Sequence, residues 1–133
     1  MASAVGNGIV LHEEDLTEKI IGAAIEVHRH LGPGLLESAY AACLCRELEL
    51  RELKYRKEAG LPLEYKGIRL ECGYRLDLIV EEKVVVEVKC VETVLPIHLA
   101  QLLTYLRLTA CRVGLLLNFK VEAMRLGIHR RVL

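Results

Sequence analysis

The chain has 133 residues, with 18 basic and 18 acidic side chains, 53% apolar residues and 27% charged residues. A chain of this length can bury one hydrophobic core, and this composition is typical of a folded globular protein rather than a disordered one. No apolar run reaches the roughly 20 residues that a membrane-spanning helix needs. The zero net charge argues against a protein that coats nucleic acid with its whole surface.

The N-terminus and the cysteines both favour a cytoplasmic protein. Residues 1–14 lack the basic start and long apolar stretch of a signal peptide, and we expect a flexible tail there before a single domain over residues 15–133. The cysteines show no C-x-x-C pair and lie in apolar segments, where a thiol behaves as a small hydrophobic group. Reduced thiols are therefore expected, rather than a disulfide framework or a zinc site. The five are Cys43, Cys45, Cys72, Cys90 and Cys111.

Basic side chains are concentrated near the C-terminus. Residues 107–133 hold six Lys and Arg against one acidic residue, whereas residues 1–106 hold 12 against 17. Two interpretations are open: a solvated surface with an uneven charge distribution, or an edge of the protein that faces phosphate groups. The six are Arg107, Arg112, Lys120, Arg125, Arg130 and Arg131.

Two helices are predicted at the N-terminal end of the domain. Apolar residues recur at helical spacing from Leu16 to Leu31, and Asp15 followed by Glu18 resembles a capping box, which predicts a helix over residues 16–31. The sequence Gly32-Pro33-Gly34 ends this helix. Pro33 then suits the opening of a second helix over about residues 34–51.

The period of the apolar residues changes after this point and predicts mainly strands. A short hairpin is expected over residues 61–65 and 68–72, and stronger strands over residues 74–80 and 84–91. Pro96 opens a third helix over residues 96–109, with its leucines on the buried side. Residues 113–119 are almost entirely apolar, as in a strand covered on both faces, and residues 127–133 are expected to add an edge strand. The fold class is therefore α/β.

The register of the two stronger strands can be derived from their alternation. Directly opposed residues on antiparallel strands share a face, so the apolar positions must oppose one another. In the resulting register Asp77 lies opposite Glu87, and Arg75 lies opposite Lys89. A slip of one residue would put the polar positions into the core. The apolar pairs predicted are Val80–Val84, Leu78–Val86 and Leu76–Val88.

Two explanations of the opposed carboxylates are open. The two groups repel each other, by about 4 kcal/mol at a separation of 4 Å and an effective dielectric constant of 20. A Mg²⁺ or Mn²⁺ ion between them would convert this repulsion into attraction, and Lys89 beside it could orient a water molecule or stabilise a phosphate. Alternatively, the hairpin has a solvated polar face on which Lys89 and Arg75 neutralise the acids.

Several helix residues are further candidates. Gln101 and Tyr105 share one face of the third predicted helix, opposite its leucines. Glu37 and Tyr40 share a face of the second helix, where the helix dipole already favours a carboxylate in the first turn. His28 lies beside the apolar stripe of the first helix, and we expect a histidine at the edge of the core there rather than a metal ligand.

The residues Gly34 to Tyr40 read G-x-x-E-x-x-Y, and from Leu16 to the C-terminus the chain resembles the GxxExxY proteins, a branch of the PD-(D/E)XK nuclease superfamily. The likeness is carried by that motif together with five other segments. These are Leu31-Gly32-Pro33-Gly34, Tyr74-Arg75-Leu76-Asp77-Leu78, Glu87-Val88-Lys89, Gln101-Leu102-Leu103-Thr104-Tyr105-Leu106 and Gly114-Leu115-Leu116-Leu117-Asn118-Phe119. The superfamily's Pro-Asp is Leu76-Asp77 in this chain.

The resemblance implies a restriction-endonuclease-like PD-(D/E)XK core, in which helices flank a central mixed β-sheet. In such folds the equivalents of Asp77 and Glu87 bind Mg²⁺ or Mn²⁺, and the equivalent of Lys89 assists the attacking water. The resemblance adds a helix-borne acid, here Glu37, and the carbonyl of Val88 to the metal shell.

The same resemblance implies where substrate would bind. Gln101 and Tyr105 look like the Q-x-x-x-Y motif of RecB-like exonucleases, which positions the substrate strand, and Tyr40 joins them as a candidate substrate contact. Arg75 is a further possible site residue. His28 resembles a histidine that some exonuclease relatives use as a metal ligand.

The function expected from these residues is metal-dependent hydrolysis of phosphodiester bonds in nucleic acid, with DNA preferred over RNA. The alternative is a catalytically inactive nucleic-acid-binding or assembly module that keeps the nuclease fold. A third reading is an enzyme for a small phosphorylated substrate, which would require a closed, narrow pocket. The domain is small, so a homodimer or a larger partner would extend the surface available to nucleic acid.

Overall fold

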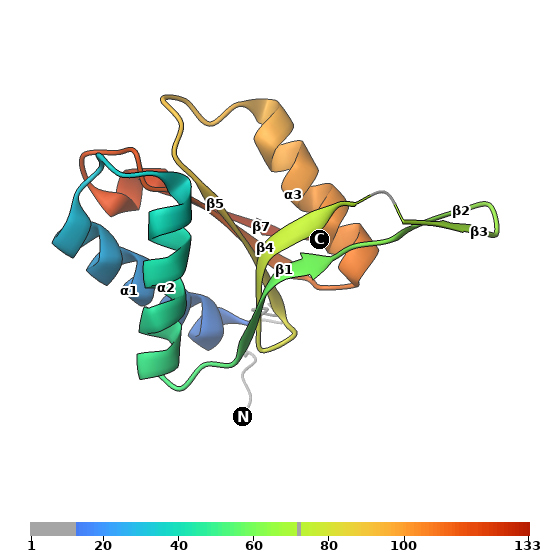
Figure 1. The fold of residues 1–133 in the computed structure, drawn as a ribbon, viewed down its shortest axis with the longest axis horizontal. Helices are drawn as coiled ribbons and strands as arrows, with labels where there is room; N and C mark the ends of the chain where they lie inside the picture. The colour runs from blue at the N-terminus through green and yellow to red at the C-terminus, as the bar shows by residue number, and fades with distance from the viewer. Residues whose placement is uncertain (1–12, 72) are drawn as a thin grey trace, which may run out of the picture.

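The computed structural model describes residues 13–71 and 73–133, and its centre is a five-stranded mixed sheet in the order β1-β4-β5-β6-β7. Neighbouring strands are antiparallel except for β5 and β6, which run parallel. Helices α1 and α2 cover one face of the sheet and α3 covers the other (Figure 1). The strands are β1 (Tyr55–Gly60), β4 (Arg75–Val80), β5 (Val84–Lys89), β6 (Val113–Asn118) and β7 (Ile128–Val132). The predicted mixed sheet flanked by helices is thus confirmed.

Helices α1 (Glu14–Leu31) and α2 (Glu37–Leu50) form where the helical spacing predicts them, but their starts differ. The helix α1 begins at Glu14, after a left-handed Glu13, and no side chain caps it, so the predicted capping box at Asp15 is wrong. Helix α2 begins at Glu37 rather than Gly34, because residues 32–36 form a separate loop. Of the predicted tail over residues 1–14, residues 1–12 lie outside the described residues.

The sheet is buried on both sides because each face has its own apolar layer. Side chains of alternate residues on β5 and β6 pack against α1 and α2, and the others pack against α3. Every residue of β6 is buried, and so are residues 84–88 of β5. The prediction that residues 113–119 form a strand covered on both faces is therefore confirmed.

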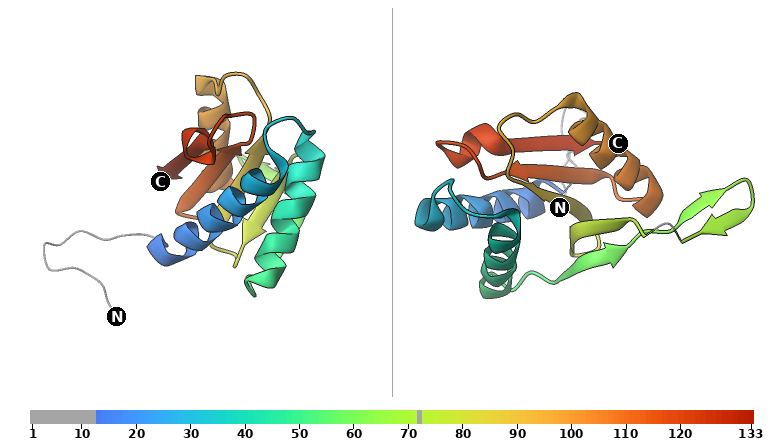
Figure 2. Two further views of the ribbon diagram at one scale, coloured as in Figure 1. Left: turned by 90° about the vertical axis from the view of Figure 1, so that its left-hand side faces the viewer. Right: turned by 45° about the horizontal axis from the view of Figure 1, so that its top comes forward.

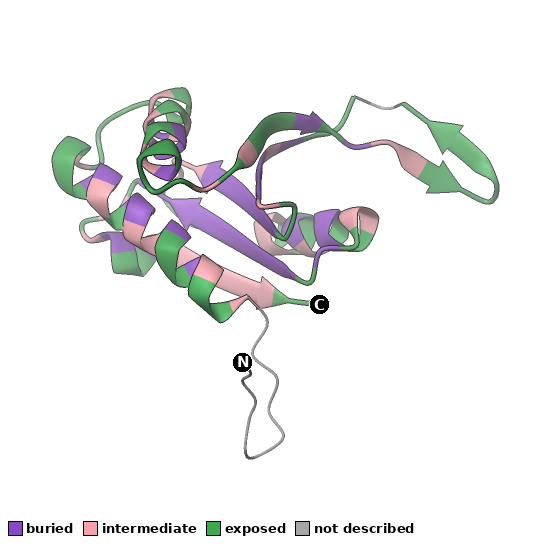
Figure 3. Ribbon diagram, turned by 90° about the horizontal axis from the view of Figure 1, so that it is seen from below, coloured by how far each residue is buried: buried purple, intermediate pink, exposed green. Residues whose placement is uncertain are grey.

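Strand β1 has no counterpart among the predicted elements. Its sequence, Tyr-Arg-Lys-Glu-Ala-Gly, lacks the alternation of a strand, and pairing with β4 at the edge of the sheet holds it in an extended conformation instead. The predicted hairpin exists in shorter form as β2 (Leu63–Tyr65) and β3 (Ile68–Leu70). It projects from the body of the protein (Figure 2), and almost all of it is exposed (Figure 3). Cys72, at its predicted end, lies outside the described residues.

The C-terminal elements follow the predicted order. Helix α3 (Pro96–Thr109) has the predicted bounds, and β7 pairs with β6 as an edge strand. A short 3₁₀ helix, η1 (Met124–Gly127), was not predicted. No helix in residues 13–71 and 73–133 combines the length and apolar character that crossing a membrane requires.

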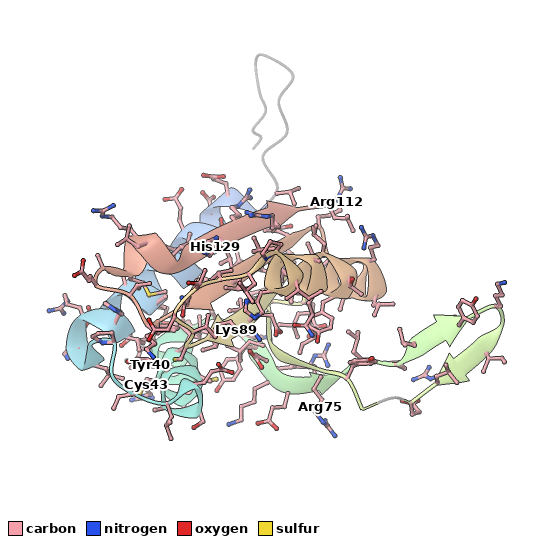
Figure 4. The ribbon with its side chains drawn as sticks, turned by 90° about the horizontal axis from the view of Figure 1, so that it is seen from above. Tyr40, Cys43, Arg75, Lys89, Arg112 and His129 are labelled. Atoms are coloured by element: carbon pink, nitrogen blue, oxygen red, sulfur yellow. The ribbon has the colours of Figure 1, made fainter. Side chains whose placement is uncertain are left out.

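Two of the six basic residues near the C-terminus, Arg112 and Lys120, have positions or partners that do not involve Asp77 and Glu87 (Figure 4). Figure 4 shows Arg112 and His129 toward β7, on the other side of the view from Arg75. Lys120 forms an ion pair with Glu92 at 2.8 Å. The charge distribution near the C-terminus therefore lends no support to a phosphate-facing edge around Asp77.

Substitution of two glycines by alanine should have opposite effects on stability. A Cβ at Gly127 would lie 1.9 Å from the carbonyl oxygen of Asn118, whereas a Cβ at Gly22, within α1, would meet nothing within 4 Å. We expect Gly127→Ala to lower the melting temperature by about 3 °C or more. Gly22→Ala should raise the free energy of unfolding by roughly 0.5–1 kcal/mol, because alanine is favoured in a helix interior. Thermal denaturation of both variants measures this, and equal melting temperatures would contradict the close approach at Gly127.

Candidate active site

The two predicted carboxylates meet where the β4–β5 ladder opens. The paired residues are Val80–Val84, Ile79–Val85 and Leu78–Val86, in the predicted register. Beyond them, the amide of Asp77 donates a hydrogen bond to Glu87 Oε2 at 3.0 Å, and the amide of Val88 donates one to Asp77 Oδ2 at 2.8 Å. Carboxylate oxygens therefore accept bonds from backbone amides that would otherwise need carbonyl partners across the ladder.

Strand β4 is also irregular on its other side at Asp77. Its pairing with β1 joins Lys57–Leu78 and Ala59–Leu76 but passes over Glu58, whose φ is +51°. Leu76 consequently packs in the layer against α3, whereas Val88 packs in the layer against α1 and α2. The predicted opposition of Leu76 to Val88 is therefore wrong.

Arg75 does not oppose Lys89 either. It pairs with Gly60 of β1, and its Nη1 donates to the carbonyl oxygen of Glu58 at 3.2 Å. The alternation of apolar and polar residues could not reveal this, because the irregularity at Asp77 depends on contacts with a third strand. The ladder between β4 and β5 does not reach Arg75 and Lys89, and the guanidinium group, held by β1, lines the same cleft as Asp77.

Burial makes the carboxylate pair electrostatically unusual. Glu87 is only 6% exposed, and burial, followed by the negative charge of Asp77, raises its pKa to about 8. Burial also raises the pKa of Asp77, although the hydrogen bond from Val88 and the charge of Lys89 oppose that rise. The alternative of a solvated polar hairpin face is therefore wrong for Glu87, whose strand is covered on both sides.

A cavity of about 730 Å³ opens beside Asp77, between the start of α2 and strands β1 and β4. It is an open cleft rather than a closed pocket, so the alternative of a small phosphorylated substrate gains no support. Its wall carries acidic, basic and hydroxyl groups together. Those side chains are Glu37, Ser38, Lys57, Glu58, Arg75 and Asp77.

Glu37, the first residue of α2, faces the end of β5. Its Oε1 accepts a hydrogen bond from the amide of Cys90 at 3.2 Å, and its charge adds to the effects that raise the pKa of Glu87. The structure thus brings Glu37 near the carboxylate pair, from an element 50 residues away in sequence.

Tyr40 lies in the hydrophobic core, as its place on the apolar stripe of the second helix indicated. It is fully buried and stacks on Phe119, with 4.6 Å between the ring centroids. Its hydroxyl donates to the carbonyl of Gly32 and accepts a bond from the amide of Leu35 at 3.1 Å. Because ring and hydroxyl are both engaged inside the protein, the predicted contact between Tyr40 and substrate is wrong. Tyr40 instead holds the loop that precedes Glu37, the first residue of α2.

His28 is likewise a structural residue. It is 8% exposed, and its Nε2 lies 2.8 Å from the carbonyl oxygen of Val121. This contact links α1 to the segment after β6. The expectation of a histidine at the edge of the core is confirmed, and the structure does not bring His28 to the carboxylates.

Lys89 lies at the end of β5, in the middle of the view in Figure 4, and its charge acts on both Asp77 and Glu87. The backbone that follows Lys89 is fixed by Asn118, a residue without a predicted role. Asn118 is 3% exposed, and its side chain exchanges two hydrogen bonds with the backbone of Val91, of 3.0 and 2.9 Å. A polar residue at the end of an otherwise apolar strand was the available signal.

The two candidate residues of α3 differ in environment. Gln101 is exposed, whereas Tyr105 is 7% exposed and belongs to the apolar layer with Leu102 and Leu106. The prediction that Tyr105 lies opposite the leucines is therefore wrong. Burial raises the pKa of the Tyr105 phenol, and the charges of Glu87 and Asp77 add to this effect.

The donor set fits a hard divalent cation that keeps part of its water. Among residues 13–71 and 73–133, no three His, Cys, Asp or Glu side chains gather into a complete protein-built metal site. Mg²⁺ does not require one, because it is commonly held by one or two carboxylates, with water and substrate phosphate as further ligands. The mutually repelling carboxylates of the half-buried Asp77 and the buried Glu87 meet that requirement.

Comparison with known proteins agrees with this arrangement. The model of the PD-(D/E)XK nuclease superfamily matches residues 14–131, and the chain belongs to that superfamily. Its members are generally nucleases that use divalent metal ions and act on nucleic acid. No curated protein and no solved structure matches the chain. The narrower resemblance to GxxExxY proteins stays a prediction.

The buried carboxylate should make the stability of the metal-free protein depend on pH. Because the pKa of Glu87 rises from 4.5 to about 8 on folding, the folded state binds more protons than the unfolded state between these values. The contribution of Glu87 to the free energy of unfolding is therefore most favourable below pH 4.5 and falls as the pH rises toward 8. We expect Glu87→Gln to raise the melting temperature at pH 8 in EDTA by several degrees, since each pKa unit corresponds to about 1.4 kcal/mol.

The matched control is Glu122→Gln, which removes the same charge from an exposed position. It should melt like the wild type at every pH. Parallel pH profiles for wild type and Glu87→Gln would contradict the burial of an ionisable Glu87.

Proposed function

We propose that the protein hydrolyses phosphodiester bonds in nucleic acid with the help of a Mg²⁺ or Mn²⁺ ion held by Asp77 and Glu87. The observation that carries this proposal is the pair of carboxylates at the open end of the β4–β5 ladder, of which Glu87 is buried and Asp77 half-buried. Such a pair is costly in a folded protein unless a proton or a cation compensates it. The carbonyl of Val88 is a further ligand proposed, and Glu37, which does not group directly with the two carboxylates, would contact the ion through a coordinated water.

When bound, the ion would polarise the phosphate and lower the pKa of a coordinated water. The protein supplies the geometry around it. Backbone amides fix one oxygen each of Asp77 and Glu87, so the carboxylates are oriented before substrate arrives. The ammonium group of Lys89 would orient the attacking water and stabilise negative charge on the phosphate. The water would lose a proton to solvent as it forms the new P–O bond, and the ester oxygen released as its P–O bond breaks would take up a proton from solvent.

The cleft beside Asp77 supports a polymeric substrate. It is open, and Lys57 and Arg75 lie on its wall with the hydroxyl of Ser38. Basic and hydroxyl groups bind phosphate oxygens without reading sequence. A nucleic acid strand in this cleft would present a phosphate to Asp77, and DNA is the substrate we propose to test first.

Cleavage should depend on Lys89. We expect purified protein to cut DNA in the presence of Mg²⁺ or Mn²⁺, and Lys89→Ala to lower the rate at least about 100-fold, because it removes a charge aimed at the reacting phosphate. Gel assays with single- and double-stranded DNA and RNA measure the rate. The control is Lys83→Ala, an exposed lysine in the turn at the other end of the β4–β5 hairpin, which should cut like the wild type. Equal cutting by Lys89→Ala would indicate a contaminating nuclease.

Metal binding should be visible without cleavage. We expect millimolar Mn²⁺ to raise the melting temperature of the wild type, since a ligand that binds only the folded state stabilises it. Asp77→Asn should abolish this increase, and Glu122→Gln should keep it. A metal-dependent increase in a protein that cuts none of the substrates would instead favour the inactive nucleic-acid-binding module. No increase in the wild type would contradict the metal site.

A further inference from the structure

A second hollow lies on the α3 side of the carboxylate pair, at the base of the β2–β3 hairpin. Its volume is about 200 Å³, below the roughly 300–1,000 Å³ that is usual for small-molecule sites. It therefore has room for a single planar group and not for a strand. The lining residues are Leu63, Tyr74, Gln101, Thr104, Tyr105 and Leu108.

The chemistry of this hollow differs from that of the cleft beside Asp77. None of its lining residues carries a formal charge, so phosphate has no partner there. Two phenol rings and two leucines offer apolar surface, and Gln101 offers an amide with both donors and an acceptor. Aromatic faces with one adaptable amide suit a nucleobase, which has a flat face and a polar edge.

Tyr74 is held in position at the mouth of the hollow. Its carbonyl oxygen accepts a hydrogen bond from the amide of Leu61 at 2.8 Å, and Leu61 is 7% exposed in the layer under α3. The ring itself is 46% exposed. A fixed backbone with an accessible ring is what a stacking platform requires, because little conformational entropy is lost when a base binds.

The hollow adjoins the proposed catalytic carboxylates. Tyr74 precedes Asp77 by three residues in an extended segment, a distance of roughly 10 Å between Cα atoms. Tyr105 lines the hollow and packs in the same apolar layer as Leu76, the residue that precedes Asp77. A base in the hollow would therefore belong to a nucleotide close to the phosphate at Asp77.

We propose that the hollow between Tyr74, Tyr105 and Gln101 binds an unpaired nucleobase next to the scissile phosphate, so that the enzyme acts on single-stranded nucleic acid. This inference rests on the proposed nuclease function and adds the form of its substrate. In a duplex, both faces of each base are stacked and its pairing edge is occupied, so only a base that is already unpaired enters the hollow without the cost of extrusion.

Binding of a fluorescein-labelled single-stranded DNA oligonucleotide, followed by anisotropy with Ca²⁺ in place of Mg²⁺, tests the inference. We expect Tyr74→Ala to weaken binding about tenfold or more, as removal of a stacking ring does, and Tyr74→Phe to stay within about twofold of wild type. The matched control is Tyr65→Ala, which removes an equally accessible tyrosine, 62% exposed, near the turn of the hairpin and outside the hollow. It should bind like the wild type.

An oligonucleotide of abasic nucleotides separates base stacking from other effects. The wild type should bind it as weakly as Tyr74→Ala binds normal DNA, and Tyr74→Ala should weaken it no further. A tenfold loss on the abasic strand as well, or an equal loss on double-stranded DNA, would overturn the base site. Wild-type affinity in Tyr74→Ala together with Lys89-dependent cleavage would overturn this inference alone, whereas absence of both binding and Lys89-dependent cleavage in the wild type would overturn the proposed function with it.

Discussion

The hydrogen bonds between the carboxylates of Asp77 and Glu87 and the backbone of the facing strands define this site. Each carboxylate accepts a bond from an amide across the gap between β4 and β5, so the sheet opens there without leaving these two amides unsatisfied. The same arrangement leaves Glu87 buried and Asp77 half-buried, where desolvation opposes the ionisation of both and the charge of Asp77 further opposes that of Glu87. A local gap in a ladder thereby becomes a place that favours a cation.

Elements distant in sequence keep this gap in shape. Tyr40 stacks on Phe119 and binds the loop before α2, which sets the position of Glu37 at the end of β5. Asn118, at the end of β6, holds the backbone that follows Lys89. The G-x-x-E-x-x-Y sequence therefore combines one residue that faces the site with one that anchors its support, which accounts for the spacing of the motif on a helix.

Two hollows of different chemistry flank the carboxylates. The larger one, beside α2, carries charged and hydroxyl groups among apolar residues, whereas the smaller one, beside α3, has no charged group and is lined by aromatic, aliphatic, hydroxyl and amide groups. A nucleic acid strand carries the same two chemistries in alternation, a charged backbone and flat bases. We therefore place the phosphate in the cleft beside α2 and the base in the hollow beside α3, with the Asp77–Glu87 pair between them.

Periodicity in the sequence alone predicted most of the helices and strands, and it placed Asp77 and Glu87 together, because an all-valine set on one strand permits only one register. It could not predict β1, whose polar residues become a strand only by pairing with β4. Nor could it show that Tyr40 packs on Phe119 whereas Tyr105 packs in the layer against α3. The shift of Leu76 to the other face of the sheet was also beyond it, because that shift depends on the left-handed Glu58 in β1. Sequence determined which groups could meet, and tertiary packing decided which became buried, because burial depends on residues that local patterns do not contain.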